Sequence, residues 1–211
     1  MPPAAKEKRR TQTERREATR RQLLDAAIDC LYESGFNGAT LVAVAERAGV
    51  TRGAVQHHFG NKDDLVIAVI DEISTRLPID VGDAVSKDRS VADRVAAITA
   101  QYWRVINSRT FVAAMQIQLA TVNDPALHSR IRDSLHKTEA ALDRQWIGLF
   151  ADQTFDAAAA VAARHVVLAS MRGFALRQIY RKAPQGWERE RGLLRKMLEQ
   201  TLTTPPKGKR G

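Results

Sequence analysis

The stretch that decides the fold covers residues 40–59 and reads TLVAVAERAGVTRGAVQHHF. In residues 41–48 the apolar side chains recur at three- and four-residue spacing, the period of one face of a helix. Gly49 follows where the chain must turn sharply, and glycine adopts the positive φ of such turns at the lowest cost. Two short helices, 41–48 and 52–59, joined through this glycine predict a helix-turn-helix.

The second predicted helix separates apolar from polar residues. Its apolar residues Val55 and Phe59 point back toward the first helix, while Arg52, Gln56 and His57 face outward. Side chains of these types suit the reading of DNA base edges and phosphates. A tight helical corner with no role in DNA recognition would show the same glycine turn. The flanking sequence is therefore needed to choose between these two interpretations.

Both flanks favour nucleic acid. Upstream, residues 1–21 carry a net charge of +5, in a basic arm that includes Lys8, Arg9, Arg10, Arg15, Arg16, Arg20 and Arg21. Downstream, Asn61 and Lys62 open a helix whose free N–H groups and lysine would clamp a phosphate. These flanks make a helix-turn-helix for DNA the better interpretation.

The segment also carries a familiar pattern: Ala26-Ala27, LYESGF over 31–36, Thr40, VAERAGVT over 44–51, Val55, His58-Phe59, Lys62 and Leu65. On these residues, the stretch from 18 to 66 resembles the DNA-binding domain of TetR-family transcriptional regulators. The resemblance covers about a quarter of the chain. One position departs from the pattern, because the family usually has a tyrosine where this chain has Gln56. Glutamine can bond both N6 and N7 of adenine, so the base preference is expected to differ from that of relatives.

The resemblance implies a DNA surface of seven side chains. Phosphate contacts would fall to Thr40 and Lys62, base edges to Arg52, Gln56 and His57, and backbone or base contacts to Thr51 and His58. It also implies a homodimer on a palindromic operator, since two-fold protein symmetry matches two half-sites about 34–36 Å apart.

The rest of the chain predicts long helices. Its seven prolines fall at the ends or breaks of the apolar pattern, and proline is expelled from helix interiors. Further helices are expected over roughly 16–34, 62–77, 90–107, 110–122, 125–151, 157–182 and 187–202. Caps are expected at Asn61 with Asp64, at Ser90 with Asp93, and at Asp124 before Pro125.

These patterns predict an all-α protein with four segments: a disordered basic arm (1–17), a three-helix DNA-binding domain (18–65), a larger helical domain for ligand binding and dimerisation (66–204), and a basic tail (205–211). The family resemblance places the dimer contact in the last two helices, and Val161, Val167, Leu168, Met171, Leu193, Leu194, Met197 and Leu198 supply apolar surface there. The same residues could instead fill the core of one subunit.

The resemblance further implies a small-molecule pocket in the larger domain, whose occupancy would shift helix 62–77. Candidate lining residues are Tyr102, Trp103, Phe111, Met115, Gln118, Trp146, His165 and Phe174, although an aromatic stripe is also typical of plain core. The class of the effector cannot be read from the sequence.

Composition bounds the remaining functions. The chain has 211 residues, a net charge of +9 and a pI near 10.1, as is usual for proteins that meet polyanions. The single cysteine, Cys30, fits a reducing compartment, and no run of about 18 apolar residues predicts a membrane span. No metal-ligand spacing, nucleophile motif or dinucleotide fingerprint is present, so neither an enzyme nor a cofactor is expected.

The expected function is therefore a cytoplasmic, nucleoid-associated transcriptional regulator, most often a repressor in this family. Two alternatives stay open: an architectural protein that binds DNA without sequence preference, and a helical small-molecule carrier whose helix-turn-helix is only a structural corner.

Overall fold

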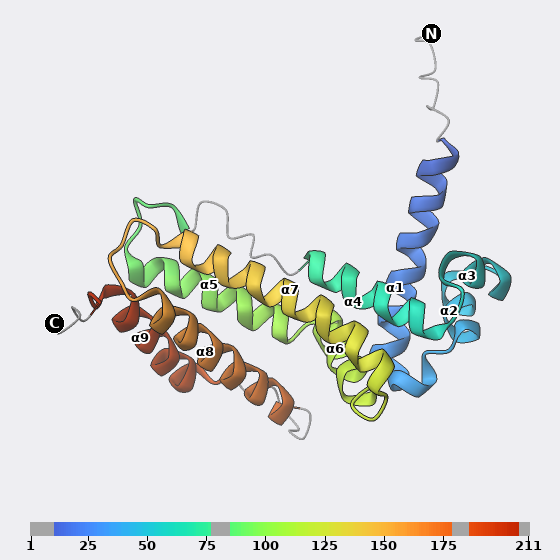
Figure 1. Cartoon of the computed structure of the whole chain (residues 1–211). Helices are drawn as coiled ribbons and strands as arrows, with labels where there is room; N and C mark the ends of the chain where they lie inside the picture. Colours follow the sequence, from blue (N-terminus) through green and yellow to red (C-terminus); the bar gives the residue numbers. More distant parts are fainter. Residues whose placement is uncertain (1–10, 77–84, 179–185, 207–211) are drawn as a thin grey trace, which may run out of the picture.

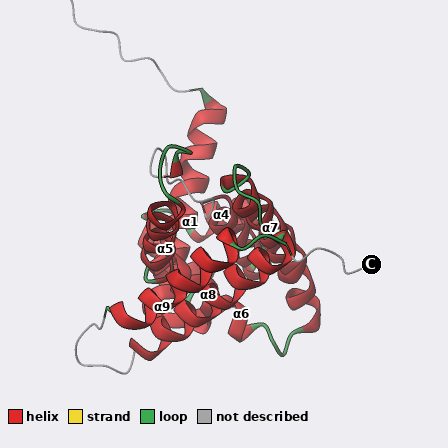
Figure 2. Ribbon diagram, turned by 90° about the vertical axis from the view of Figure 1, so that its left-hand side faces the viewer, coloured by secondary structure: helices red, strands yellow, loops and turns green. Residues whose placement is uncertain are grey.

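The structure, a computed structural model, describes residues 11–76, 85–178 and 186–206. Within these ranges the chain forms nine helices and no strand, so the all-α prediction is confirmed (Figures 1 and 2). The helices are α1 (Gln12–Gly38), α2 (Leu41–Ala48), α3 (Arg52–Phe59), α4 (Lys62–Arg76), α5 (Val91–Ile106), α6 (Arg109–Ala120), α7 (Pro125–Leu149), α8 (Ala157–Gln178) and α9 (Glu188–Thr203).

Within the described residues the predicted helix bounds hold to within a few residues, except at the start of α1, while the predicted helix ends at 77 and 182 lie outside these residues. The first helix was expected from about residue 16, after a disordered arm, but residues 12–15 already form its first turn. Thr11 and Glu14 explain the difference, because they form a capping box: the Thr11 hydroxyl accepts from the Glu14 N–H at 3.2 Å, and the Glu14 carboxylate accepts from the Thr11 N–H at 2.7 Å. Residues 1–10 and 207–211 of the expected arm and tail lie outside the described residues.

The expected caps are also present. The backbone N–H of Asp64 donates to Asn61 Oδ1 at 2.9 Å, and that of Leu127 donates to Asp124 Oδ1 at 3.1 Å. At the start of α5 the Ser90 hydroxyl accepts from the Asp93 N–H at 3.1 Å, and it donates to the Asp93 carboxylate at 2.7 Å. The local sequence therefore sets where these helices begin.

The helix-turn-helix forms at the predicted place. Gly49 has φ 65° and ψ 32°, the left-handed conformation expected of the turn. Val44, Val55 and Phe59 are buried where α2 and α3 meet. The side chain of Gln22 on α1 donates to the Ala48 carbonyl at 2.7 Å, which fixes the end of α2 against α1.

The hydrophobic core has two parts. The first joins α1–α4 to α6 and the beginning of α7, and the second joins α5, the end of α7, α8 and α9. Helix α1 packs most extensively against α6, so the helices around the helix-turn-helix share the first core with the larger helical body. Figure 1 shows the result: α2 and α3 lie at one end of an elongated molecule, while α9 lies toward the other.

Helix α8 is the one helix in the described part of the chain that is long and apolar enough to cross a membrane, although the sequence predicted none. It packs against α5, α7 and α9, and it carries Arg164, which is buried and paired with Asp143. One face of α8 therefore belongs to the second core.

Candidate nucleic-acid interface and internal cavity

The polar residues of α3 lie on one open surface. Arg52, Gln56 and His57 are all exposed, whereas the neighbouring Val55 and Phe59 are buried. Their outward orientation agrees with the sequence prediction. A helix of eight residues with three exposed donors and acceptors has the size and chemistry to enter the major groove.

Thr40 and Thr51 flank this surface as helix caps. The Thr40 hydroxyl accepts from the Ala43 N–H at 3.1 Å, and the Thr51 hydroxyl accepts from the Ala54 N–H at 3.2 Å. Each hydroxyl keeps its own proton for a further acceptor such as a phosphate oxygen. Both residues are exposed.

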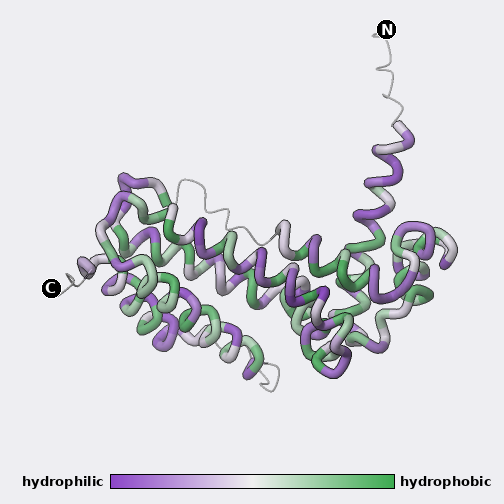
Figure 3. Tube along the Cα trace, viewed as in Figure 1, coloured by the Kyte–Doolittle hydropathy of each residue, from purple (hydrophilic) through white to green (hydrophobic). Residues whose placement is uncertain are grey.

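His58 is half-buried between α3 and α1. Its ring lies 6.1 Å from the ring of Phe59, and the guanidinium of Arg20 lies over the same phenylalanine at 5.4 Å. Burial is the main cause that lowers the pKa of His58, and the charges of His57, Arg16 and Arg20 act in the same direction. Figure 3 shows the hydrophilic start of α1 that supplies these arginines and projects beyond the body of the molecule.

Lys62 has a second task that the sequence did not indicate. Its Nζ donates to the Phe36 carbonyl at 2.6 Å and lies 4.2 Å from the centre of the Phe36 ring. Burial lowers the pKa of Lys62, while Asp63 opposes that shift. The lysine therefore joins the start of α4 to the end of α1, and in this geometry part of its donor capacity is used within the protein.

A group of four charged residues connects α1, α2 and α6. Arg47 on α2 binds Glu33 through two hydrogen bonds, and Arg109 on α6 lies 3.0 Å from Asp29. Arg109 also stacks over Tyr32 at 5.1 Å. Since Arg109 opens the helix that carries Phe111, this group ties the helix-turn-helix to the larger helical body.

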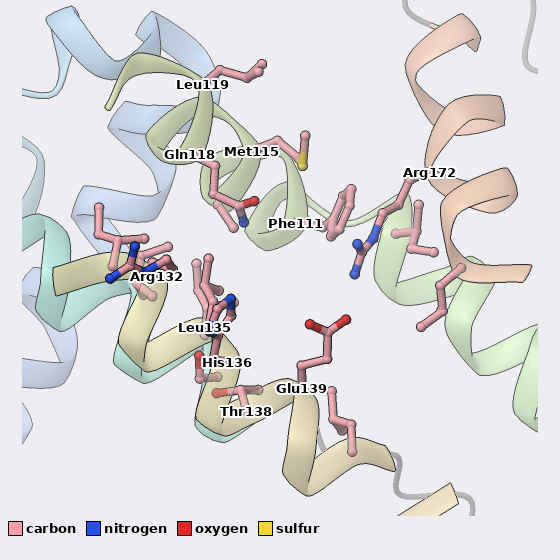
Figure 4. A pocket seen from close by; sticks show the side chains of 18 of the residues that line it. Phe111, Met115, Gln118, Leu119, Arg132, Leu135, His136, Thr138, Glu139 and Arg172 are labelled. Carbon is pink, nitrogen blue, oxygen red and sulfur yellow. The ribbon is translucent and has the colours of Figure 1, made fainter. Parts of the chain in front are cut away.

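That body encloses a cavity of about 470 Å³ between α4, α5, α6, α7 and α8 (Figure 4). The size lies within the range of small-molecule sites. Four of the eight predicted lining residues do line it: Tyr102, Phe111, Met115 and Gln118.

The other four predicted lining residues lie elsewhere, each for a visible reason. Trp146 is 1% exposed and donates to the Ala160 carbonyl within the second core. Phe174 stacks on Trp187 at 4.8 Å, and Trp103 packs under Arg191 at 4.9 Å. His165 faces Asp143 at 3.0 Å on the outer side of α8.

The sequence reasoning missed most of the polar lining. His128, Arg132, His136, Thr138 and Glu139 enter the cavity from α7, Arg164 and Arg172 from α8, and Ser74 from α4. On α7 the spacing of three and four residues would have placed several of these on one face, but nothing in the sequence said which helices would oppose that face. His128 and His136 both line the cavity, and the described residues contain no group of three possible metal ligands.

Helix α7 also touches α4 directly. Arg130 lies 2.9 Å from Asp64, and the Ser134 hydroxyl donates to Asp71 at 2.7 Å. Residues between these two, such as Ile131, line the cavity. A movement of α7 at the cavity wall would therefore be passed directly to α4, the helix that follows α3.

Comparison with known proteins also indicates a DNA-binding regulator. The profile of the "Bacterial regulatory proteins, tetR family" matches residues 23–69, which contain the helix-turn-helix. The HTH-type transcriptional regulator CymR of Pseudomonas putida is 27% identical over 184 residues, covering 87% of this chain and 91% of that protein. Residues 23–69 therefore carry the DNA-binding region of the TetR family.

Other comparisons point the same way. The HTH-type transcriptional regulator BetI of Burkholderia cenocepacia is 29% identical over 178 residues, covering 71% of this chain and 92% of its own. The fold matches that of FadR from Bacillus subtilis, solved in complex with stearoyl-CoA, with a TM-score of 0.62 and 17% identity over 86% of this chain and 97% of that one. This protein is a helix-turn-helix transcriptional regulator, and both of these curated relatives are regulators rather than enzymes.

Proposed function

We propose that this TetR-family regulator is a repressor that binds a palindromic operator as a homodimer and is controlled by a small molecule in its internal cavity. The observation that carries the proposal is the exposed row of Arg52, Gln56 and His57 on α3. These side chains are assigned to base edges, while Thr40 and Lys62 are assigned to phosphates and Thr51 and His58 to backbone or bases. Repression is the usual mode of the family.

The exposed apolar residues of α8 and α9 support dimerisation. Val166 is 52% exposed, Leu176 is 43% exposed and Leu193 is 68% exposed, although all three are large and apolar. Most of the eight residues predicted from sequence for this contact are not free to form it. Val167, Leu168, Met171 and Leu198 are buried within the subunit, and Leu193 alone among the eight is exposed. The proposed contact is therefore formed by the outer rather than the inner faces of these helices.

The cavity supports control by a small molecule. Ile70, Ile73 and Ser74 place α4 in its wall, and α4 follows directly after α3. A ligand that binds better to one position of α4 shifts the population toward it and so changes the spacing of the two α3 helices in a dimer. FadR from Bacillus subtilis holds stearoyl-CoA in the same fold, which supports a ligand site without naming the ligand.

Selection of duplexes from a random DNA library tests the proposal. The wild-type protein is expected to enrich one inverted repeat with half-sites about one helical turn apart, or a multiple of that. The Gln56→Ala variant is expected to enrich the same repeat with one relaxed position in each half-site. Enrichment of no common sequence by the wild-type protein would refute the proposal and favour an architectural DNA-binding protein.

A further inference from the structure

The charged residues that line the cavity are not equally satisfied. Arg164 donates to the Tyr102 hydroxyl at 3.0 Å and binds the Asp143 carboxylate, so its charge is neutralised. Arg132 lies at the surface, 3.5 Å from Asp133 and within 3.3 Å of the Ser129 hydroxyl. Neither of these arginines offers a free charge to the cavity.

Arg172 is exposed as well, so it lies at the open side of the cavity, but it differs from the other two in its partners. Within the described part of the chain, its guanidinium makes no hydrogen bond or ion pair. It lies over the Phe111 ring, 5.8 Å from the ring centre. Figure 4 shows it reaching into the space between α6 and α7. Removal of water around the group lowers its pKa, and Glu139 partly opposes that shift, but an arginine remains charged at neutral pH.

Among the described residues that line the cavity, Glu139 is the single carboxylate, and it faces Arg172 from α7 (Figure 4). Its Oε1 also lies 3.8 Å from His165 Nε2. A cationic ligand would have to compete for this carboxylate beside Arg172. A dianion such as a phosphate monoester would meet one free guanidinium and one opposing carboxylate. The charges therefore favour a ligand with a single negative charge.

The remainder of the cavity is mostly apolar, with walls that include Ile70, Ile73, Met115, Leu135 and Leu142. On the α4 wall the Ser74 hydroxyl is buried and has no hydrogen-bond partner among the described residues. Buried hydroxyls are normally paired, so this one marks a place where a polar atom of a ligand would be accepted. The cavity thus offers a cation on α8, an apolar middle and an unpaired hydroxyl on α4.

We infer that the effector is a small amphipathic carboxylic acid. Its carboxylate pairs with the planar, two-pronged guanidinium of Arg172, its apolar body packs on Phe111 between α6 and α7, and a hydroxyl or keto group bonds Ser74. The inference rests on the proposed function, because it names the ligand class of the same cavity.

Titration calorimetry with matched acids and primary amides tests the charge. The probes are alkanoates of six to twelve carbons and one- and two-ring aromatic acids, each beside its own amide. At least one acid is expected to bind about tenfold or more tightly than its amide, the ratio that a lost charge-assisted bond predicts. Failure of every acid to bind, or equal binding of acids and amides, would overturn the inference.

Four variants locate the contacts. Arg172→Gln is expected to remove the preference for acids, and Glu139→Gln is expected to strengthen acid binding because it removes the opposing charge. Arg132→Gln is the matched control, since it removes an arginine that already has partners, and it should leave the preference unchanged. Ser74→Ala should weaken hydroxy and keto acids relative to plain acids. Retention of the acid preference in Arg172→Gln would contradict the assignment.

DNA binding without ligand separates this inference from the proposed function. Arg172 lies on α8, far along the chain from α3, so its variant is expected to keep the operator preference of the wild type. An operator-specific protein that binds no acid would contradict the ligand class alone. A protein without sequence preference would contradict the proposed function, whatever it binds in the cavity.

Discussion

Replacing Gly49 with alanine tests whether the turn of the helix-turn-helix depends on backbone conformation alone. An added Cβ at Gly49 would meet no atom within 4 Å, so no clash is expected. The left-handed conformation, with φ 65°, costs an L-residue about 1–2 kcal/mol, while alanine stabilises by about 0.4–1 kcal/mol through the unfolded chain. The variant should therefore lose about 1 kcal/mol of unfolding free energy.

Gly148→Ala is the matched control. It also has no atom within 4 Å of an added Cβ, but it lies within the helix α7. Gly148 is in the last turn of that helix and is not among the glycines with positive φ, so alanine there should gain at most about 0.5 kcal/mol. Thermal unfolding at a fixed protomer concentration is the assay, and each kcal/mol should move Tm by about 2–4 °C in a chain of this length. A Gly49→Ala variant that is as stable as the wild type would refute the reasoning.

Four further predictions follow from named contacts. Arg94 is fully buried, and its ion pair with Asp152 holds the pKa of that carboxyl well below the usual range. Asp152→Asn should therefore lower the unfolding free energy by about 3 kcal/mol at neutral pH. Because the ionised carboxylate is the stabilising form, the difference in unfolding free energy between variant and wild type, measured by denaturant titration, should shrink as pH falls below about 4. Burial lowers the pKa of His58, so its protonation destabilises the fold as pH falls through about 6.5, and a His58→Gln variant should lack that part of the pH dependence of Tm. Gln56→Ala should alter the base preference at one operator position by about 1–3 kcal/mol. Lys62→Met should weaken binding to all DNA sequences alike, and it should lower Tm because the hydrogen bond to the Phe36 carbonyl is lost. Equal losses of affinity on every sequence in both variants would show that the assignment of Gln56 is wrong. Leu193 is exposed in the proposed dimer contact, so Leu193→Glu should give a monomer in sedimentation experiments where the wild type sediments as a dimer. An unchanged mass would place the subunit contact elsewhere.

Local rules made most of the fold predictable. Gly49, Thr40 and Asp124 act through neighbours three or four residues away, so their roles could be read from sequence alone. The same is true of the outward row on α3, because successive residues of a helix point about 100° apart, so Gln56 and His57 point away from the buried side of Val55. The start of α1 was missed even though Thr11 and Glu14 have the spacing of a capping box.

The cavity was harder to predict because it depends on which helices oppose one another. Trp146 and Phe111 are both aromatic residues of the predicted helices. Trp146 is buried in the second core, whereas Phe111 packs at the edge of that core and lines the cavity. The task of Lys62 depends on the Phe36 carbonyl, 26 residues away in the chain. Likewise, the sequence does not show that Glu139 on α7 and Arg172 on α8 line the same cavity, because that depends on how the two helices pack.

A salt-series competition titration tests most directly whether this regulator reads a DNA sequence. Labelled duplex carrying the selected inverted repeat, or the upstream intergenic DNA of its own gene, is titrated beside a shuffled duplex of equal length and composition. A preference of about 10³-fold or more at physiological salt is the expected result. Equal affinities that fade together as salt rises would contradict the claim, because phosphate contacts alone would then account for the binding.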